Sequence, residues 1–188
     1  MLNSTALAGS TPTDHRLLRQ VAAGDQSAFD ELYKTYSPAV FNYLLRLVNE
    51  PSVAEELLQD VFLAMWQGAG HFREQAKVKT WLLRIAHHQA VSWLRHNRAV
   101  TALDDLAELA GDDQIEEHLA QTWRVDQIRQ ALDQLSVKHR AVIELTFVHE
   151  LSYAEIAEIV SCPVGTVKSR MSYALRHLTA VLGNQAEP

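Results

Sequence analysis

The stretch LSYAEIAEIVSCPVGTVKSRMSYALRHL, residues 151–178, has the layout of two short helices joined by a tight turn. Ser152 and Glu155 stand at the spacing of a capping box, which predicts a helix start. Ser161-Cys162 is the predicted turn, and Pro163 suits the first position of the second helix. Apolar residues at helical spacing are expected to face inward from both helices: Ile156, Ala157, Val160, Val167, Met171, Ala174 and Leu178. The pattern predicts a helix-turn-helix.

The opposite face of the second predicted helix is polar. Its side chains can reach phosphates and base edges when a helix enters the major groove. They are Thr166, Lys168, Ser169, Arg170, Ser172, Tyr173 and Arg176. The alternative is a solvated face on an ordinary helical hairpin. Cys162 is interpreted as a small buried residue at the turn.

Nearly every other periodic segment also has helical spacing, and no convincing run of alternating strand residues is found. The sequence therefore predicts an all-α protein of two small helical domains joined by an acidic linker. Helix boundaries are expected at Gly24-Asp25 with cap Ser27, at Asn49–Pro51 with cap Ser52, at Gly68 and Gly70, and at Leu135-Ser136. The predicted parts are a disordered tail (1–13), an N-terminal helical bundle (14–98), the acidic linker (99–122), a helix-turn-helix domain (123–182) and a short tail (183–188).

The formal net charge of −6 argues at first against a nucleic-acid partner, but the charge is unevenly distributed. Residues 99–122 hold seven acidic residues and no basic one, whereas residues 14–98 and 123–188 are close to neutral. Residues 71–98 carry six Lys and Arg against the single Glu74. Because a patch binds through its local field, a nucleic-acid partner remains open.

Residues 53–67 form an amphipathic helix on a helical wheel. The predicted buried side chains are Ala54, Leu57, Leu58, Val61, Ala64 and Met65. The opposite side carries Glu56, Gln59, Asp60 and Leu63, with Phe62 and Trp66 at its margins. An exposed leucine bordered by aromatic and acidic residues is typical of a surface that docks another protein. The alternative is that Phe62, Leu63 and Trp66 pack against neighbouring helices of the same bundle.

The helix predicted over residues 81–98 contains the adjacent histidines His87 and His88. The wheel turns one apolar set inward: Leu82, Ile85, Ala86, Ala90, Trp93 and Leu94. Its outward sector holds Arg84, Arg95 and Arg98, with the two histidines at opposite margins, about 100° apart. Because adjacent helical residues do not face each other, the pair is not expected to share a metal, and no metal site is predicted.

The basic sector continues into the preceding connector through Arg73, Lys77 and Lys79, and Trp81 lies at its edge. Cations beside an aromatic residue are the usual platform for single-stranded nucleic acid. Phe72 and Trp81 could stack on bases. The alternatives to DNA binding are that the cations form a solubilising surface and that Phe72 and Trp81 pack in the core.

Several classes of protein are disfavoured. No Gly-rich phosphate loop, plausible Cys nucleophile or His-Glu metal motif is found, so neither a catalytic residue nor a cofactor is predicted. The single cysteine excludes an internal disulfide framework and favours a reducing cytoplasm. No apolar run approaches the roughly 20 residues that span a bilayer, so no membrane insertion is expected. The N-terminal segment also lacks the basic-then-apolar order of a signal peptide.

The chain resembles the bacterial RNA polymerase sigma factors, specifically the extracytoplasmic-function (ECF) group. The resemblance lies in four segments. They are SAFDELYKTYSPAVFNYL (27–44, opening region), AEELLQDVFLAMWQG (54–68, core-polymerase-binding helix), FREQAKVKTWLLRIAHHQAVSWLR (72–95, promoter-melting region) and LDQLSVKHRAVIELTFVHELSYAEIAEIVSCPVGTVKSRMSYALRHL (132–178, C-terminal promoter domain). Two domains in the right order are more specific than a helix-turn-helix alone.

The resemblance implies a factor that binds core RNA polymerase and directs promoter-specific initiation in a stress or envelope response. Core-polymerase binding would involve Glu56, Gln59, Asp60, Phe62, Leu63 and Trp66. Melted minus-ten DNA would meet Arg73, Lys77, Lys79, Trp81, Arg84, His87, His88 and Arg95. Duplex minus-thirty-five DNA would meet Ser152, Tyr153, Pro163, Thr166, Lys168, Ser169, Arg170, Ser172, Tyr173 and Arg176. An anti-sigma factor is the further partner implied, and the family's linker threads into the polymerase near the RNA path.

One position departs from the family pattern. The family usually has asparagine where this chain has His88, at a position that helps to read a flipped minus-ten base. A histidine presents different hydrogen-bonding groups, so the resemblance leaves the preferred base open.

The sequence is also compatible with two rival interpretations. A stand-alone helix-turn-helix regulator, acting as a dimer on a palindrome, explains only the C-terminal domain. A helical protein-interaction adaptor would use the helix-turn-helix only as a structural element. The regulator interpretation leaves the docking helix and the basic helix unexplained.

Overall fold

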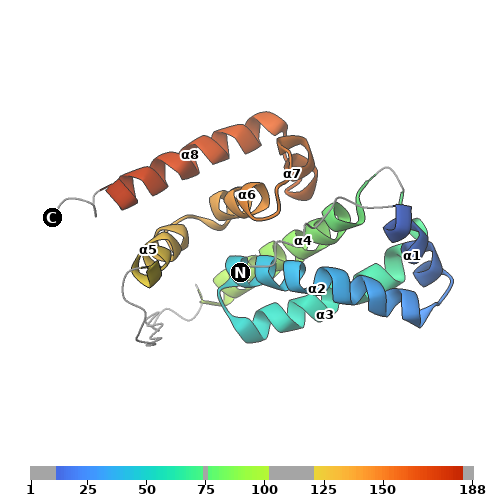
Figure 1. Cartoon of the computed structure of the whole chain (residues 1–188). Helices are drawn as coiled ribbons and strands as arrows, with labels where there is room; N and C mark the ends of the chain where they lie inside the picture. Colours follow the sequence, from blue (N-terminus) through green and yellow to red (C-terminus); the bar gives the residue numbers. More distant parts are fainter. Residues whose placement is uncertain (1–11, 74–75, 102–120, 184–188) are drawn as a thin grey trace. The chain divides into compact units, whose positions relative to one another are not determined.

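The computed structural model describes residues 12–73, 76–101 and 121–183, and within these ranges the chain is helical with no strand (Figure 1). The helices are α1 (Pro12–Ala22), α2 (Gln26–Val48), α3 (Pro51–Gly68), the short 3-10 turn η1 (Ala69–His71), α4 (Val78–Thr101), α5 (Gln121–Asp133), α6 (Val137–Phe147), α7 (Tyr153–Ile159) and α8 (Val164–Gly183). The predicted all-α class is confirmed. Most of the predicted acidic linker, and nearly all of both predicted tails, lie outside the described residues.

The described residues form two compact units, one built mainly from α1–α4 and the other mainly from α5–α8. In the first unit, α2 packs against both α1 and α3. Tyr43, Leu44 and Leu47 of α2 and Val61 and Met65 of α3 are essentially inaccessible to solvent. These side chains form the core of the first unit.

The breaks between α1, α2 and α3 fall where the sequence predicts them, but two caps differ. The carboxylate of Asp25 accepts hydrogen bonds from the backbone N–H groups of Ser27 and Ala28, at 2.8 and 3.2 Å. Asp25, and not Ser27, therefore caps α2. Similarly, α3 begins at Pro51, with Glu50 as its N-cap, so the predicted cap at Ser52 is wrong. A proline at the first helical position starts this helix without a side-chain cap.

The second unit contains the predicted helix-turn-helix, formed by α7 and α8. The capping box is confirmed, because the backbone N–H of Ser152 donates to Glu155 Oε2 at 2.9 Å and the N–H of Glu155 donates to Ser152 Oγ at 3.4 Å. In the turn, Ser161 adopts a φ of 50°. Pro163 lies one residue before α8, not at its first position, and its carbonyl accepts the N–H of Val167 at 3.2 Å.

The predicted inward stripe of the helix-turn-helix is largely confirmed. Six apolar side chains of the two helices are buried: Ile156, Ile159, Val160, Val167, Met171 and Ala174. Ala157 and Leu178, which were also predicted to face inward, are only half-buried. Ile159 was not predicted, although it stands three residues after Ile156.

A buried arginine ties the end of α5 to the start of α6. The Arg140 guanidinium donates to the backbone carbonyls of Leu132 at 3.1 Å, Asp133 at 2.8 Å and Leu135 at 3.2 Å. It also lies 3.4 Å from the Asp133 carboxylate. Carbonyls at the end of a helix lack intrahelical partners, so this side chain satisfies them.

Replacing Arg140 with Ala should lower the free energy of unfolding by about 2–4 kcal/mol, because it leaves these carbonyls unsatisfied. Urea unfolding of the full chain measures the change. Arg129→Ala provides the control, since Arg129 is exposed on α5. Equal losses for the two variants would contradict the role assigned to Arg140.

Candidate functional site

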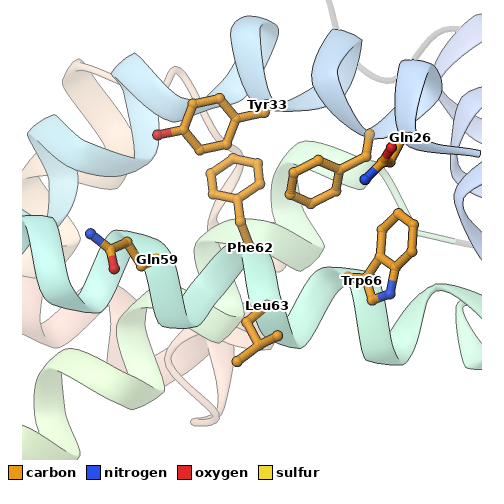
Figure 2. Close-up of a pocket in the computed structure, with 7 residues that line it drawn as sticks. Gln26, Tyr33, Gln59, Phe62, Leu63 and Trp66 are labelled. Atoms are coloured by element: carbon orange, nitrogen blue, oxygen red, sulfur yellow. The ribbon is translucent and has the colours of Figure 1, made fainter.

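A shallow aromatic hollow lies on the surface of the first unit, between α2 and α3. Its volume is about 390 Å³. The hollow is lined by Gln26, Phe29 and Tyr33 of α2 and by Gln59, Phe62, Leu63 and Trp66 of α3. Figure 2 shows the Tyr33 and Phe62 rings facing each other across the two helices, while Leu63 points away from α2.

Edge-to-face ring contacts fix the shape of the hollow. The Tyr33 and Phe62 centroids are 4.7 Å apart at 60°, and the Phe29 and Trp66 centroids are 5.5 Å apart at 81°. Such pairs are favourable beyond the area they bury. The hollow is therefore largely formed before any partner binds.

The residues predicted on the outer face of α3 divide into exposed and buried members. Glu56, Gln59 and Asp60 are exposed, and Leu63 keeps 55% of its surface accessible. Phe62, predicted at the margin of this face, is only 2% exposed. It is a wall of the hollow and part of the core, because the rings of α2 cover it. An apolar side chain as exposed as Leu63 beside a concave aromatic surface is typical of a protein-docking site.

The α2 half of the hollow was not predicted from the sequence. Phe29 and Tyr33 stand one helical turn apart, and this spacing is the signal that could have found them. Their partners on α3 lie more than 25 residues further along the chain.

On α4 and the connector before it, most of the predicted minus-ten residues are at the surface. The exposed members are Arg73, Lys77, Arg84, His88 and Arg95. Trp81 is half-buried, while the side chain of Arg98 lies outside the described residues. The predicted basic face therefore exists, with Arg84, His88 and Arg95 on one helix.

Two residues predicted on this basic face are instead buried. Lys79 is 6% and His87 is 7% exposed. Both lie on the stripe that contains the buried Leu83 and Ala90, since these positions are three or four residues apart. His87 was predicted at the surface because the inward direction of the wheel for residues 81–98 lies to one side of this stripe. Lys79 was predicted in the connector, but α4 begins at Val78 and includes it. The prediction that Lys79 and His87 face the DNA is therefore wrong, because both side chains belong to the core.

His87 is bonded to another buried side chain. Its Nδ1 lies 2.9 Å from the hydroxyl of Tyr43, which is inaccessible to solvent. A buried polar group is stable when it is hydrogen-bonded, so the pair ties α4 to α2. His88 is exposed, and the two histidines therefore have separate roles.

Removing the Tyr43 hydroxyl by a Tyr43→Phe substitution should lower the free energy of unfolding by about 1–2 kcal/mol, because His87 loses this partner inside the core. Urea unfolding measures the loss. Adding EDTA should leave the unfolding curves of both proteins unchanged. A curve that shifts with EDTA would indicate a bound metal and contradict this role for His87.

Two aromatic residues and α1 position the basic connector. The rings of Phe72 and Trp81 are 5.0 Å apart, and His15 of α1 lies 5.7 Å from the Phe72 ring. His15 Nε2 also lies 3.2 Å from the carbonyl oxygen of Ala76. A Cβ atom added to Gly68 would meet Trp81 at 3.3 Å, so the close approach of this ring favours glycine.

The predicted DNA-facing residues of α8 cover a wide arc of the helix. Ser169, Ser172, Tyr173 and Arg176 lie opposite the buried stripe and are exposed. At the margins lie the exposed Lys168 on one side and the half-buried Thr166 and Arg170 on the other. The centre of this face thus presents hydroxyl groups, an aromatic ring and a guanidinium.

The remaining predicted minus-thirty-five residues lie at the N-terminal ends of α7 and α8. Pro163 is exposed and Tyr153 is half-buried. Ser152 is exposed, and its hydroxyl donates to Glu155 Oε2 at 2.7 Å. This hydroxyl therefore stabilises the start of α7.

None of the helices in the described ranges combines the length and apolar character that crossing a bilayer requires. In that part of the chain, no group of three or more His, Cys, Asp or Glu side chains is placed to hold a metal ion.

Comparisons with known proteins identify both units. The family described as Sigma-70 region 2 matches residues 32–100, and Sigma-70, region 4 matches residues 126–178. The chain is 33% identical over 172 residues to the ECF RNA polymerase sigma factor SigK of Mycobacterium sp. (strain KMS), covering 89% of each sequence. It is 30% identical to the ECF RNA polymerase sigma factor SigW of Bacillus subtilis (strain 168), covering 82% of this chain and 88% of SigW.

A solved structure shows the same fold. The sigma factor RpoE, crystallised with the anti-sigma factor NepR from Bartonella quintana, superposes with a TM-score of 0.67 at 28% identity. The match covers 82% of this chain and 96% of that one. The resemblance inferred from the sequence is confirmed, and the chain belongs to the ECF sigma factors, which direct RNA polymerase to promoters for transcription initiation.

Proposed function

We propose that the activity of this sigma factor is divided among three surfaces. The outer face of α3 and the aromatic hollow dock core RNA polymerase. The exposed residues of α4 and its connector hold the melted minus-ten element, and the outer face of α8 reads the duplex minus-thirty-five element. The exposure of Leu63 beside the preformed hollow carries this proposal, because a stand-alone DNA-binding regulator has no need of such a surface.

The docking assignment rests on shape and charge. Leu63 and the hollow supply an apolar centre, and the exposed Glu56, Gln59 and Asp60 supply a polar rim. Protein interfaces commonly have this anatomy, with most binding energy in a few central side chains. A basic segment of the polymerase would complement the two acidic residues.

The two DNA assignments rest on local charge and geometry. Arg73, Arg84 and Arg95 provide cations for the backbone of a melted strand, and the exposed His88 lies between the two α4 arginines in sequence. On α8, Arg176 and the hydroxyls of Ser169 and Ser172 are suited to phosphate and base-edge contacts in a major groove.

An anti-sigma factor is the proposed regulatory partner. The structural relative RpoE is bound to the anti-sigma factor NepR. We assign the hollow and Leu63 as part of the surface that such a partner covers, since blocking them would prevent docking to the polymerase. The inducing stress would then act by releasing this partner.

The remaining predictions follow from this function. The domain boundaries 14–98 and 123–182 stay as proposed, with residues 99–122 as the linker between a polymerase-docking unit and a promoter-reading unit. The chain would work in the cytoplasm, where its polymerase lies, and would contribute binding energy with no catalysis of its own.

Pull-down with core polymerase followed by run-off transcription tests the proposal. The chain should bind core enzyme and confer initiation at specific start sites. A stand-alone regulator would bind duplex DNA without core enzyme, and an adaptor would confer neither activity. Either of these results would refute the proposed function.

A further inference from the structure

Three aromatic rings lie close together on the second unit. The rings of His139 of α6 and Tyr173 of α8 stack with centroids 4.3 Å apart and planes 23° from parallel. His177, one turn further along α8, lies almost parallel to Tyr173, at 6.4 Å and 5°. His139 is therefore the closer neighbour of the Tyr173 ring.

The imidazole of His139 is also hydrogen-bonded to its own end of α6. Its Nδ1 lies 2.9 Å from the hydroxyl of Ser136, the N-cap residue of α6. The Ser136 side chain makes no capping hydrogen bond to the helix backbone. Its one described bond orients the histidine, so the sequence SVKH links the start of α6 to the exposed face of α8.

Tyr173 keeps 49% of its surface exposed although it is stacked. It lies next to Ser169, Ser172 and Arg176 on the face proposed to read the minus-thirty-five element. A ring fixed in one rotamer loses less conformational entropy on binding than one that is free to turn.

We propose that His139 is a positioning residue for promoter binding, and that its imidazole holds the Tyr173 ring toward the DNA. This inference rests on the proposed role of α8. Nothing in the pattern of the helix-turn-helix assigns a role to His139, since it lies outside α7 and α8.

The surroundings of His139 should also make DNA binding depend on pH. Burial, followed by the electrostatic effect of Arg170, His177 and Lys138, holds the pKa of His139 below its ordinary value in the free chain. Arg170 and His177 lie on α8, and Lys138 lies on α6. DNA phosphates brought to this surface favour the imidazolium and so raise the pKa of His139 in the complex. Binding then takes up a proton, and affinity increases as the pH falls from 8 to 6.

The test uses holoenzyme assembled from the full chain and a duplex upstream fragment of the promoter that it transcribes most strongly. At pH 8, His139→Ala should weaken binding roughly threefold to tenfold, which is the typical strength of one ring pair. His139→Phe keeps the ring contact and should bind within about twofold of wild type. As the pH falls to 6, wild type should gain affinity over His139→Phe, which cannot take up the proton. His71→Phe is the control, because His71 is exposed in the first unit.

Each outcome decides the proposal. Wild-type affinity for His139→Ala at pH 8, or equal weakening by the Ala and Phe variants, would overturn the positioning role. Equal pH profiles for wild type and His139→Phe would overturn the proton uptake. If wild-type holoenzyme itself showed no preference for the promoter duplex over an unrelated one, the failure would lie in the proposed role of α8.

Discussion

Replacing Leu63 with Arg should weaken binding of the chain to core RNA polymerase by at least about thirtyfold, the effect expected at the centre of an interface. Leu63 is a large apolar side chain exposed on α3, and it borders the aromatic hollow. A guanidinium there would lose its hydration against an apolar partner surface. It would also carry the sign opposite to that of Glu56 and Asp60, which we expect to face basic groups on the polymerase.

The measurement is a titration of labelled chain with core enzyme, and the fold is monitored by thermal unfolding. Because Leu63 is 55% exposed, the melting curve should not change. Asn42→Arg is the matched control, since it adds the same charge at an exposed position of α2 outside the hollow. Equal polymerase affinities for the Leu63 and Asn42 variants would show that α3 does not dock the polymerase.

Replacing His88 with Asn should change which minus-ten base is preferred. The ratio of transcription from promoters that differ at this base should shift by about tenfold, while the affinity for the polymerase stays the same. His88 is exposed on α4, so the exchange does not disturb the core. An imidazole and a carboxamide present different donors and acceptors, and a matched contact to a base edge contributes about 1–3 kcal/mol of discrimination. The family pattern has asparagine at this position, so the variant should acquire the preference of its relatives.

A library randomised over the minus-ten element, transcribed by both holoenzymes, measures the preference. His96→Asn is the control, because His96 is also exposed on α4 but lies two turns further along the helix. Identical minus-ten base preferences for wild type and the His88 variant would show that His88 does not read a base.

The features predicted well from the sequence depend on short-range spacing. The capping box of Ser152 and Glu155, the turn at Ser161 and the buried stripe of α8 each involve residues a few positions apart. The exposure of Leu63 followed in the same way from the helical period of α3. Local patterns of this kind are set by helix geometry and do not depend on residues distant in the sequence.

The predictions that failed depend on partners distant in the sequence. His87 is buried because Tyr43, 44 residues earlier, offers a hydrogen-bonding partner inside the bundle. Polar side chains carry no hydrophobic signal, so the helical wheel of residues 81–98 predicts His87 at the margin of the basic sector. Lys79 is predicted in the connector before that helix, whereas α4 begins at Val78 and so includes it. The aromatic hollow and the stack of His139 on Tyr173 also join different helices, and no local period reveals them.

Site-specific photocrosslinking in a promoter-bound holoenzyme tests the division of labour most directly. A photoreactive amino acid replaces His88 in one protein and Arg176 in another, and the crosslinked DNA strand and position are mapped. We predict that position 88 crosslinks to the melted non-template strand of the minus-ten element and position 176 to the duplex minus-thirty-five element. Crosslinks from position 88 to duplex DNA alone, or from position 176 to the melted strand, would contradict this prediction.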